Sequence, residues 1–125
     1  TRCLVGSEMC IRDRIKSVDE VKKFMRENSS PYVFNCDEPE TIRFEWFLSN
    51  DEQSATLIEM FADSDAAKLR LEHHSESHLI QEFPEYFKIK NFIVLGDIKE
   101  DMREKLEGWS ADQRVYVGGF FKQSR

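Results

Sequence analysis

Two glutamates and an arginine on a predicted β-hairpin could carry out acid–base chemistry. Residues 41–49 alternate as a strand does, residues 50–52 favour a turn, and residues 55–62 read as the returning strand. Glu45 and Glu59 then lie on neighbouring strands, and we expect them on one face with Arg43 beside them. Two carboxyl groups that share a proton acquire separated pKa values, so one can act as a base near neutral pH. The alternative is a structural Arg–Glu network.

Three histidines crowd one predicted helix, residues 66–81. His73 falls on the same stripe as Ala66 and Leu69, so it is expected to point inward more than His74 does. His73 and His78 are therefore candidate general bases that titrate near neutrality. His74 and His78 have the spacing of a metal-binding pair, but no third ligand follows at a convincing distance, so no metal is predicted. A solvated helix face is the alternative.

A set of large side chains could line a pocket for a flat substrate. Most of them lie on the predicted hairpin, and the last lies near the C-terminus. Such residues are also the usual content of a hydrophobic core, which is the alternative. The candidate substrate-binding residues are Phe44, Trp46, Met60, Phe61 and Tyr116.

The elements around these residues follow a recognisable order. Ser17 and Glu20 form a capping box before a helix, which is expected to break or kink at residues 28–31. A strand is predicted over 91–96, a helix over 99–109 and a last strand over 115–121. The resulting order of helix, strand, strand, helix, strand, helix and strand is an α+β, ferredoxin-like split βαβ sandwich without its first strand.

The N-terminal segment has an unusual origin in this interpretation. Residues 3–11 show neither strict alternation nor a helical stripe. Residues 3–13, CLVGSEMCIRD, resemble one translated reading frame of the transposase adapter used for short-read sequencing libraries, and Arg14 is allowed by the next codon. Residues 1–14 are therefore predicted to be non-native, the native first strand to be missing, and residues 15–125 to form a single domain.

Composition excludes several classes of partner. The chain has 125 residues and a formal net charge of −6, without a basic stripe, so nucleic acid is not an expected partner. No apolar run approaches the roughly 18 residues of a membrane span. With residues 1–14 set aside, Cys36 is the remaining cysteine, which favours a reducing cytoplasm.

Several stretches resemble the antibiotic biosynthesis monooxygenase-like domains, a family of dimeric α+β barrels. Residues 38–45, EPETIRFE, are similar to the Glu-Pro-Gly-Thr-Leu-Arg-Tyr-Glu segment that begins the family's hairpin. Residues 57–66, LIEMFADSDA, resemble its Glu-x-Tyr-Ala-Asp-x-x-Ala step from strand to helix. Residues 95–97 and 118–120 resemble the ending of a subgroup, so the similarity extends from about Val18 to Lys122.

The resemblance implies a homodimer through the sheet face, with a pocket inside each subunit between sheet and helices. It implies a monooxygenase that oxidises a phenol or quinol with molecular oxygen and needs no cofactor. Two alternatives stay open: a small-molecule-binding or stress-response module without catalysis, and a haem-degrading enzyme. The chain departs from the family at Glu40, where glycine is usual, and at Arg70, where the family's helix histidine would fall.

Overall fold

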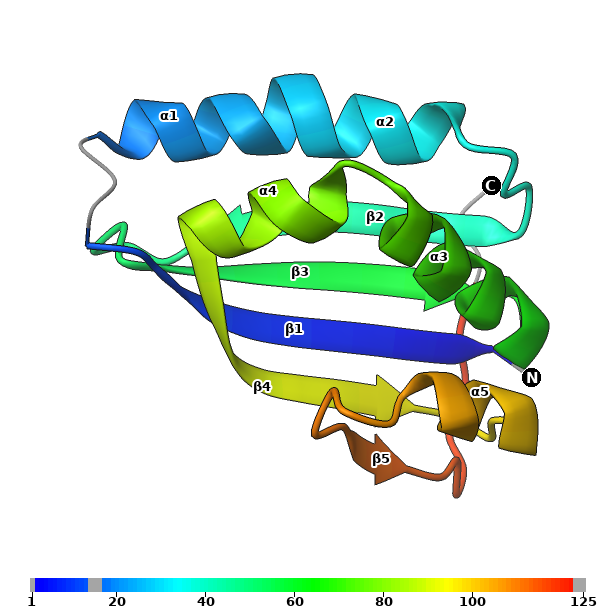
Figure 1. Cartoon of the computed structure of the whole chain (residues 1–125). Helices are drawn as coiled ribbons and strands as arrows, with labels where there is room; N and C mark the ends of the chain where they lie inside the picture. Colours follow the sequence, from blue (N-terminus) through cyan, green and yellow to red (C-terminus); the bar gives the residue numbers. More distant parts are fainter. Residues whose placement is uncertain (1, 14–16, 123–125) are drawn as a thin grey trace.

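The computed structural model describes residues 2–13 and 17–122. Helical segments separate the strands except between β2 and β3, and Figure 1 shows the helices in front of the sheet. The elements are β1 (Cys3–Ile11), α1 (Val18–Lys23), η1 (Phe24–Ser29), α2 (Ser30–Asn35), β2 (Thr41–Leu48), β3 (Ser54–Phe61), α3 (Ser64–Glu76), α4 (Leu79–Tyr86), β4 (Phe87–Leu95), α5 (Glu100–Lys105) and β5 (Asp112–Arg114).

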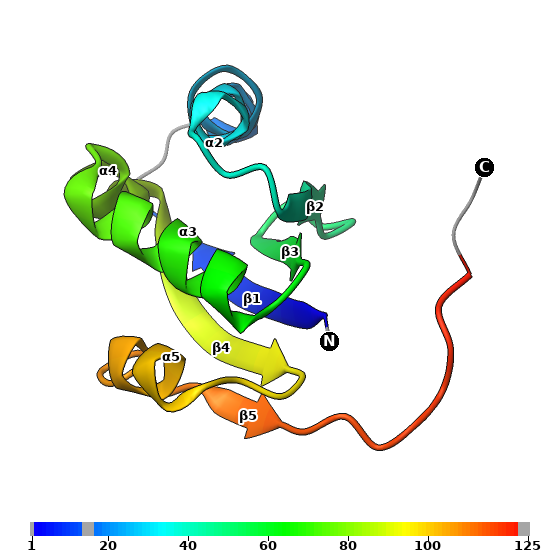
Figure 2. The ribbon, with the colours of Figure 1, turned by 90° about the vertical axis from the view of Figure 1, so that its right-hand side faces the viewer.

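One sheet organises the molecule, with strand order β2-β3-β1-β4-β5. β1 pairs antiparallel with β3 and β4, β2 pairs antiparallel with β3, and β5 adds a short parallel pairing to β4. Figure 2 shows the helices gathered on one side of the sheet, while the C-terminal segment runs along the other side. This α+β arrangement, with β3 between β1 and β2 and β1 between β3 and β4 in two split βαβ units, is the ferredoxin-like fold predicted from the element order.

The position of the first strand is occupied in this chain, and the non-native origin of residues 1–14 stays a prediction. Residues 3–11 form β1, the central strand, and Cys3, Val5 and Met9 on its helix-facing side are buried. The buried Ser7 completes this alternation. The sequence hides this alternation, because serine and cysteine are not strongly apolar and Leu4 adds an apolar residue on the opposite face.

The helical segment continues through residues 28–31, where a break or kink was expected. Ser17 caps α1 by accepting a hydrogen bond from the backbone N–H of Asp19 at 3.0 Å. The chain then widens into the π-helical turns of η1 and returns to α-helix with Pro31 in the first turn of α2. A wide turn and an early helical position both accommodate a proline that lacks an N–H. The π-turns end at Ser29, which is buried against the interior.

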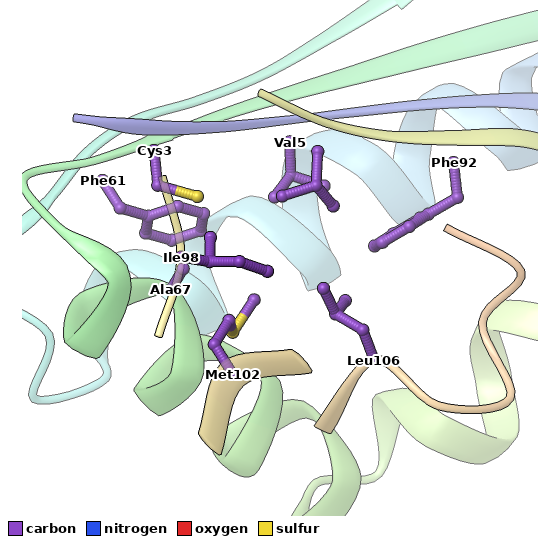
Figure 3. Packing of buried hydrophobic residues seen from close by; sticks show 9 residues of the cluster. Cys3, Val5, Phe61, Ala67, Phe92, Ile98, Met102 and Leu106 are labelled. Carbon is purple, nitrogen blue, oxygen red and sulfur yellow. The ribbon is translucent and has the colours of Figure 1, made fainter. Parts of the chain in front are cut away.

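Two hydrophobic clusters pack between the sheet and the helices. Figure 3 shows the first, in which Val5 and Phe92 from the sheet face Met102 and Leu106. The second cluster lies at the other end of the sheet and packs it against α1, η1, α2 and α4, with Phe24 and Phe87 at its centre. The sheet therefore has a covered face toward the helices and an open face on the other side.

The predicted last strand over 115–121 is wrong. Pairing with β4 ends at Arg114, and the described residues that follow are not in a strand. Val117 is 95% exposed and Phe120 is 86% exposed. The β-branched and aromatic residues favour a strand by propensity, but β4 offers them no partner because it ends at Leu95.

Candidate functional site

A cavity of about 250 Å³ lies between the covered face of the sheet and the helices. Its wall is mostly apolar, and five polar side chains interrupt it. The polar residues are Ser7, Ser29, Glu59, Arg70 and His74. Such a cavity is small for a ligand pocket, which typically has about 300–1,000 Å³, and suits a compact molecule of one or two rings.

The alternation of β3 carries Glu59 into this cavity. In the register, Glu59 lies opposite Val5 of β1 and Phe44 of β2, so all three side chains project from the covered face. Leu57 and Phe61, two residues before and after Glu59, also line the cavity. Glu59 is half-buried, and it borders this cavity.

Burial raises the pKa of the Glu59 carboxyl group to about 7. The positive charge of Arg70 opposes this shift, and the negative charge of Glu38 adds to it. The carboxyl group is therefore poised between its acid and base forms near neutral pH. A buried carboxyl of this kind in a cavity is the expected setting of a general acid or base.

Arg70 and Glu38 form a buried ion pair at the edge of the cavity. Arg70 lies two turns into α3, and its Nη1 donates to Oε2 of Glu38 at 2.8 Å, with side chains 5% and 2% exposed. His73 Nδ1 lies 2.7 Å from the same oxygen, and Thr41 Oγ1 donates to the other carboxylate oxygen at 3.1 Å. Glu38 thereby holds Arg70 in place from the loop between α2 and β2.

The orientation predicted for the neighbouring histidines is reversed in the structure. His74 lines the cavity, with its ring centroid 6.2 Å from Phe83 and 6.0 Å from Trp109. Burial, followed by the charge of Arg70, lowers the pKa of His74 to about 4, so its ring is neutral at physiological pH. His73 instead turns toward Glu38.

His78 lies away from the cavity wall. Its side chain is 49% exposed, and its Nε2 lies 2.9 Å from Oδ1 of Asn28. It precedes α4, because α3 ends at Glu76 and the predicted continuous helix is interrupted at Ser77. This interruption removes the i,i+4 geometry on which the spacing of His74 and His78 depended.

Glu45 and Glu59 do not share a face, contrary to the expectation. Glu45 is exposed on the open face and forms an ion pair with Arg43, whereas Glu59 faces the cavity. The shift in register between Thr41 and Arg43 pairs Phe44 with Glu59 and places Glu45 opposite Ile58. Glu45 therefore fits the structural Arg–Glu network, and Glu59 remains the candidate for acid–base chemistry.

The aromatic residues predicted to bind a substrate are divided between several places. Phe44 and Phe61 line the cavity. Trp46 is on the covered face but packs in the second cluster, stacked on Phe87 at 5.2 Å, and its buried Nε1 has no hydrogen-bond partner among the described residues. Met60 is buried on the opposite face of β3, and Tyr116 is 63% exposed in the C-terminal segment.

Sequence reasoning missed the contributions of Arg70, Glu38 and His74. The signal for Arg70 was present, because it occupies the position at which the resembled family carries a helix histidine. Glu38 gave no signal, since it lies in a turn-forming acidic stretch where carboxylates are normally solvated. Only the packing of α3 against the α2–β2 loop brings it to Arg70.

One group of side chains has the composition of a metal site. Cys36, Glu38 and His73 each place a possible ligand atom within 4.8 Å of one another. Both oxygens of Glu38 already accept hydrogen bonds, and the guanidinium of Arg70 lies 2.8 Å from one of them. A cation at this position would meet that positive charge, so the ion pair accounts for the geometry without a metal.

No protein-family model matches the sequence, and no curated protein sequence matches it either. Solved structures do resemble it. MupZ from Pseudomonas fluorescens aligns with a TM-score of 0.75 and 16% identity over 98% of this chain and 89% of its own. Protein YjcS aligns with a TM-score of 0.58 and 17% identity over 79% of this chain and 100% of its own.

Protein PA3566 from Pseudomonas aeruginosa aligns with a TM-score of 0.50 and 14% identity, over 75% of this chain and 89% of its own. At these identities the comparisons show the fold alone: a ferredoxin-like α+β domain. They give no support to an adapter origin of residues 3–14. Among residues 2–13 and 17–122, no helix has the length and apolar character needed to cross a membrane.

Proposed function

We propose that the protein is a cofactor-independent oxygenase of the antibiotic biosynthesis monooxygenase-like family, acting on a phenol or quinol. The single observation that carries this proposal is Glu59, a half-buried carboxyl with a pKa of about 7 in a mostly apolar cavity. Phe44, Phe61 and Trp109 supply flat surfaces for an aromatic ring.

In the proposed reaction Glu59 takes the proton of a phenolic hydroxyl. An ordinary phenol has a pKa of about 10, so transfer to a base of pKa near 7 is uphill by about 3 pH units, an amount that a neighbouring positive charge can offset. The resulting phenolate is electron-rich and reacts with oxygen directly. The mostly apolar wall favours the entry of molecular oxygen.

The electrons balance without a further reductant. For a hydroquinone, one oxygen atom forms a new C–O bond at a ring carbon, and the O–O bond of the resulting peroxide then breaks. The second oxygen atom leaves as water with two hydrogens of the substrate, one from the ring carbon and one from a hydroxyl group, and the organic product is a hydroxyquinone. The substrate itself supplies the four electrons that reduce oxygen.

The proposal includes a homodimer through the open face of the sheet. Phe47 and Leu95 lie on this face and are 49% and 40% exposed. Apolar side chains on a sheet face that the molecule's own helices leave uncovered favour a second layer. The dimer would leave the cavity intact, because the cavity lies on the covered face.

Oxygen uptake with a panel of dihydroxy-aromatic compounds tests the activity. Glu59→Gln should abolish uptake, whereas Glu45→Gln is a matched control on the open face and should retain it. If the unmodified protein consumes no oxygen above the blank with any member of the panel, the oxygenase proposal fails. Binding of the same compounds without oxygen uptake would then favour the non-catalytic module.

Haem degradation is the weaker alternative: a neutral histidine, His74, borders the cavity, but a volume of about 250 Å³ holds one or two rings and not a tetrapyrrole. A neutral imidazole is the form that binds iron. Titration with haem should shift the Soret band if this reading holds, and His74→Gln should remove the shift. An unshifted band removes haem from consideration.

A further inference from the structure

Arg70 places a charged hydrogen-bond donor at the cavity, and this donor takes no part in the ion pair with Glu38. Its side chain is 5% exposed and borders the cavity. Nη1 is bonded to Glu38, but Nη2 is buried and has no hydrogen-bond partner among the described residues. Burying a charged donor without an acceptor costs free energy, so a built site of this kind is expected to receive an acceptor.

The surroundings define the acceptor. Glu59 lines the same cavity and interacts electrostatically with Arg70, and burial holds its carboxyl group partly in the protonated form. In that form Glu59 is a second donor toward the same part of the cavity. A guanidinium and a carboxylic acid that face one apolar space favour an oxygen atom carrying negative charge.

We propose that Arg70 is the specificity-determining residue of the cavity, binding through Nη2 the anionic oxygen of an aromatic carboxylate or phenolate. The inference rests on the proposed function and deepens it, because it names the chemical class of ligand: a compact aromatic ring that carries an acidic oxygen. Glu38 and His73 are positioning residues in this arrangement, since Glu38 fixes the guanidinium and His73 contacts Glu38 from the outside.

Guanidinium geometry explains why an arginine suits this position. One nitrogen pairs with Glu38 while another remains for the ligand, so the same side chain is anchored and available. A lysine has a single ammonium group, which Glu38 would retain. The ion pair also keeps the empty cavity electrically neutral, which limits the cost of holding a charge there.

Calorimetric titration of the full chain with 1-naphthoate and 1-naphthamide tests the proposal. The two probes have nearly the same shape, but only the carboxylate is anionic. We expect the unmodified protein to bind naphthoate at least about tenfold more tightly, which corresponds to about 1.4 kcal/mol. Equal binding of the two probes, or binding of neither, would overturn the assignment.

Variants locate the preference. The double change Arg70→Gln with Glu38→Gln removes both charges of the ion pair together and should abolish the preference for naphthoate. Arg43→Gln, which removes an exposed arginine from the open face, should leave it unchanged. If the double variant does not fold, Arg70→Lys keeps the charge but not the second donor, and the preference should still fall; an unchanged preference in Arg70→Lys contradicts the proposal.

The outcome is separable from the oxygenase proposal. Selective binding of naphthoate without any oxygen uptake would leave the anion site standing and remove the oxygenase. If the protein consumes oxygen with phenols but binds both probes equally, the oxygenase proposal stands and the anion site is removed. Titration with 1-naphthol as a third probe then separates recognition of a phenolate from recognition of a carboxylate.

Discussion

Replacing Glu59 with glutamine should change how the stability of the protein depends on pH. The ordinary pKa of the side chain, 4.5, applies to the unfolded chain, and burial raises it to about 7 in the folded protein. Between these values the folded state holds a proton that the unfolded state has lost. Stability therefore falls as the pH rises through this window, and it is constant below and above it.

The size of the effect follows from the difference in pKa. Each pH unit contributes about 1.4 kcal/mol, so a difference of about 2.5 costs the folded protein about 3 kcal/mol by the time the pH exceeds 7. Glutamine does not ionise and escapes this loss. Relative to the unmodified protein, Glu59→Gln should gain about 3 kcal/mol between pH 4.5 and about pH 8.

His74 has the opposite dependence, which hides the effect in the unmodified protein. Its pKa falls from 6.5 to about 4 on folding, so the unfolded chain binds the extra proton between these values and stability rises with pH. Between pH 4.5 and 6.5 the two slopes cancel as far as these two groups are concerned. The unmodified protein should be nearly flat there, and Glu59→Gln should become more stable as the pH rises.

Urea unfolding at a series of pH values measures this difference directly. A fixed protein concentration is needed because dimer formation would contribute to apparent stability. Glu45→Gln is the control, since Glu45 is exposed on the open face, and its difference from the unmodified protein should be independent of pH. A Glu59→Gln difference that stays within about 0.5 kcal/mol from pH 4.5 to about pH 8 would refute the argument that Glu59 is buried beside Arg70.

Three further predictions concern the core, the open face and the N-terminus. Phe61→Ala should lower the free energy of unfolding by about 3–5 kcal/mol, because Phe61 is 1% exposed, whereas Phe34→Ala at an 87% exposed position should change it by less than about 0.5 kcal/mol. Phe47→Glu should give a monomer in sedimentation experiments that show the unmodified protein as a dimer; a dimer that survives would exclude this part of the open face from the interface. Sequencing of the source DNA across the codons for Thr1 to Val21 tests the adapter origin. If the genomic bases differ from the adapter sequence, residues 3–11 are not native and the genomic codons give the native first strand. If the genomic codons are identical to the adapter sequence, the prediction is disproved.

The sequence alone determined the hairpin, the helix that follows it and the fold class. Alternation over two runs around a short polar turn is a local signal, and it correctly separates Leu57, Glu59 and Phe61 from Thr56, Ile58 and Met60. The cap at Ser17 is equally local. The element order then leaves few topologies, because a split βαβ arrangement requires a central strand next to β3, whichever residues supply it.

Relations between elements were decided only by the tertiary structure. A one-residue shift of register near Thr41 sends Glu45 to the open face and pairs Phe44 with Glu59, and no local pattern reveals such a shift. Which of two adjacent histidines faces inward depended on how α3 rotates against the sheet. The carboxyl of Glu38 became a partner of Arg70 because a surface-type turn is buried by α3. Burial and long-range charge set the pKa of Glu59, and both are properties of the packed molecule rather than of the residues around it in the chain.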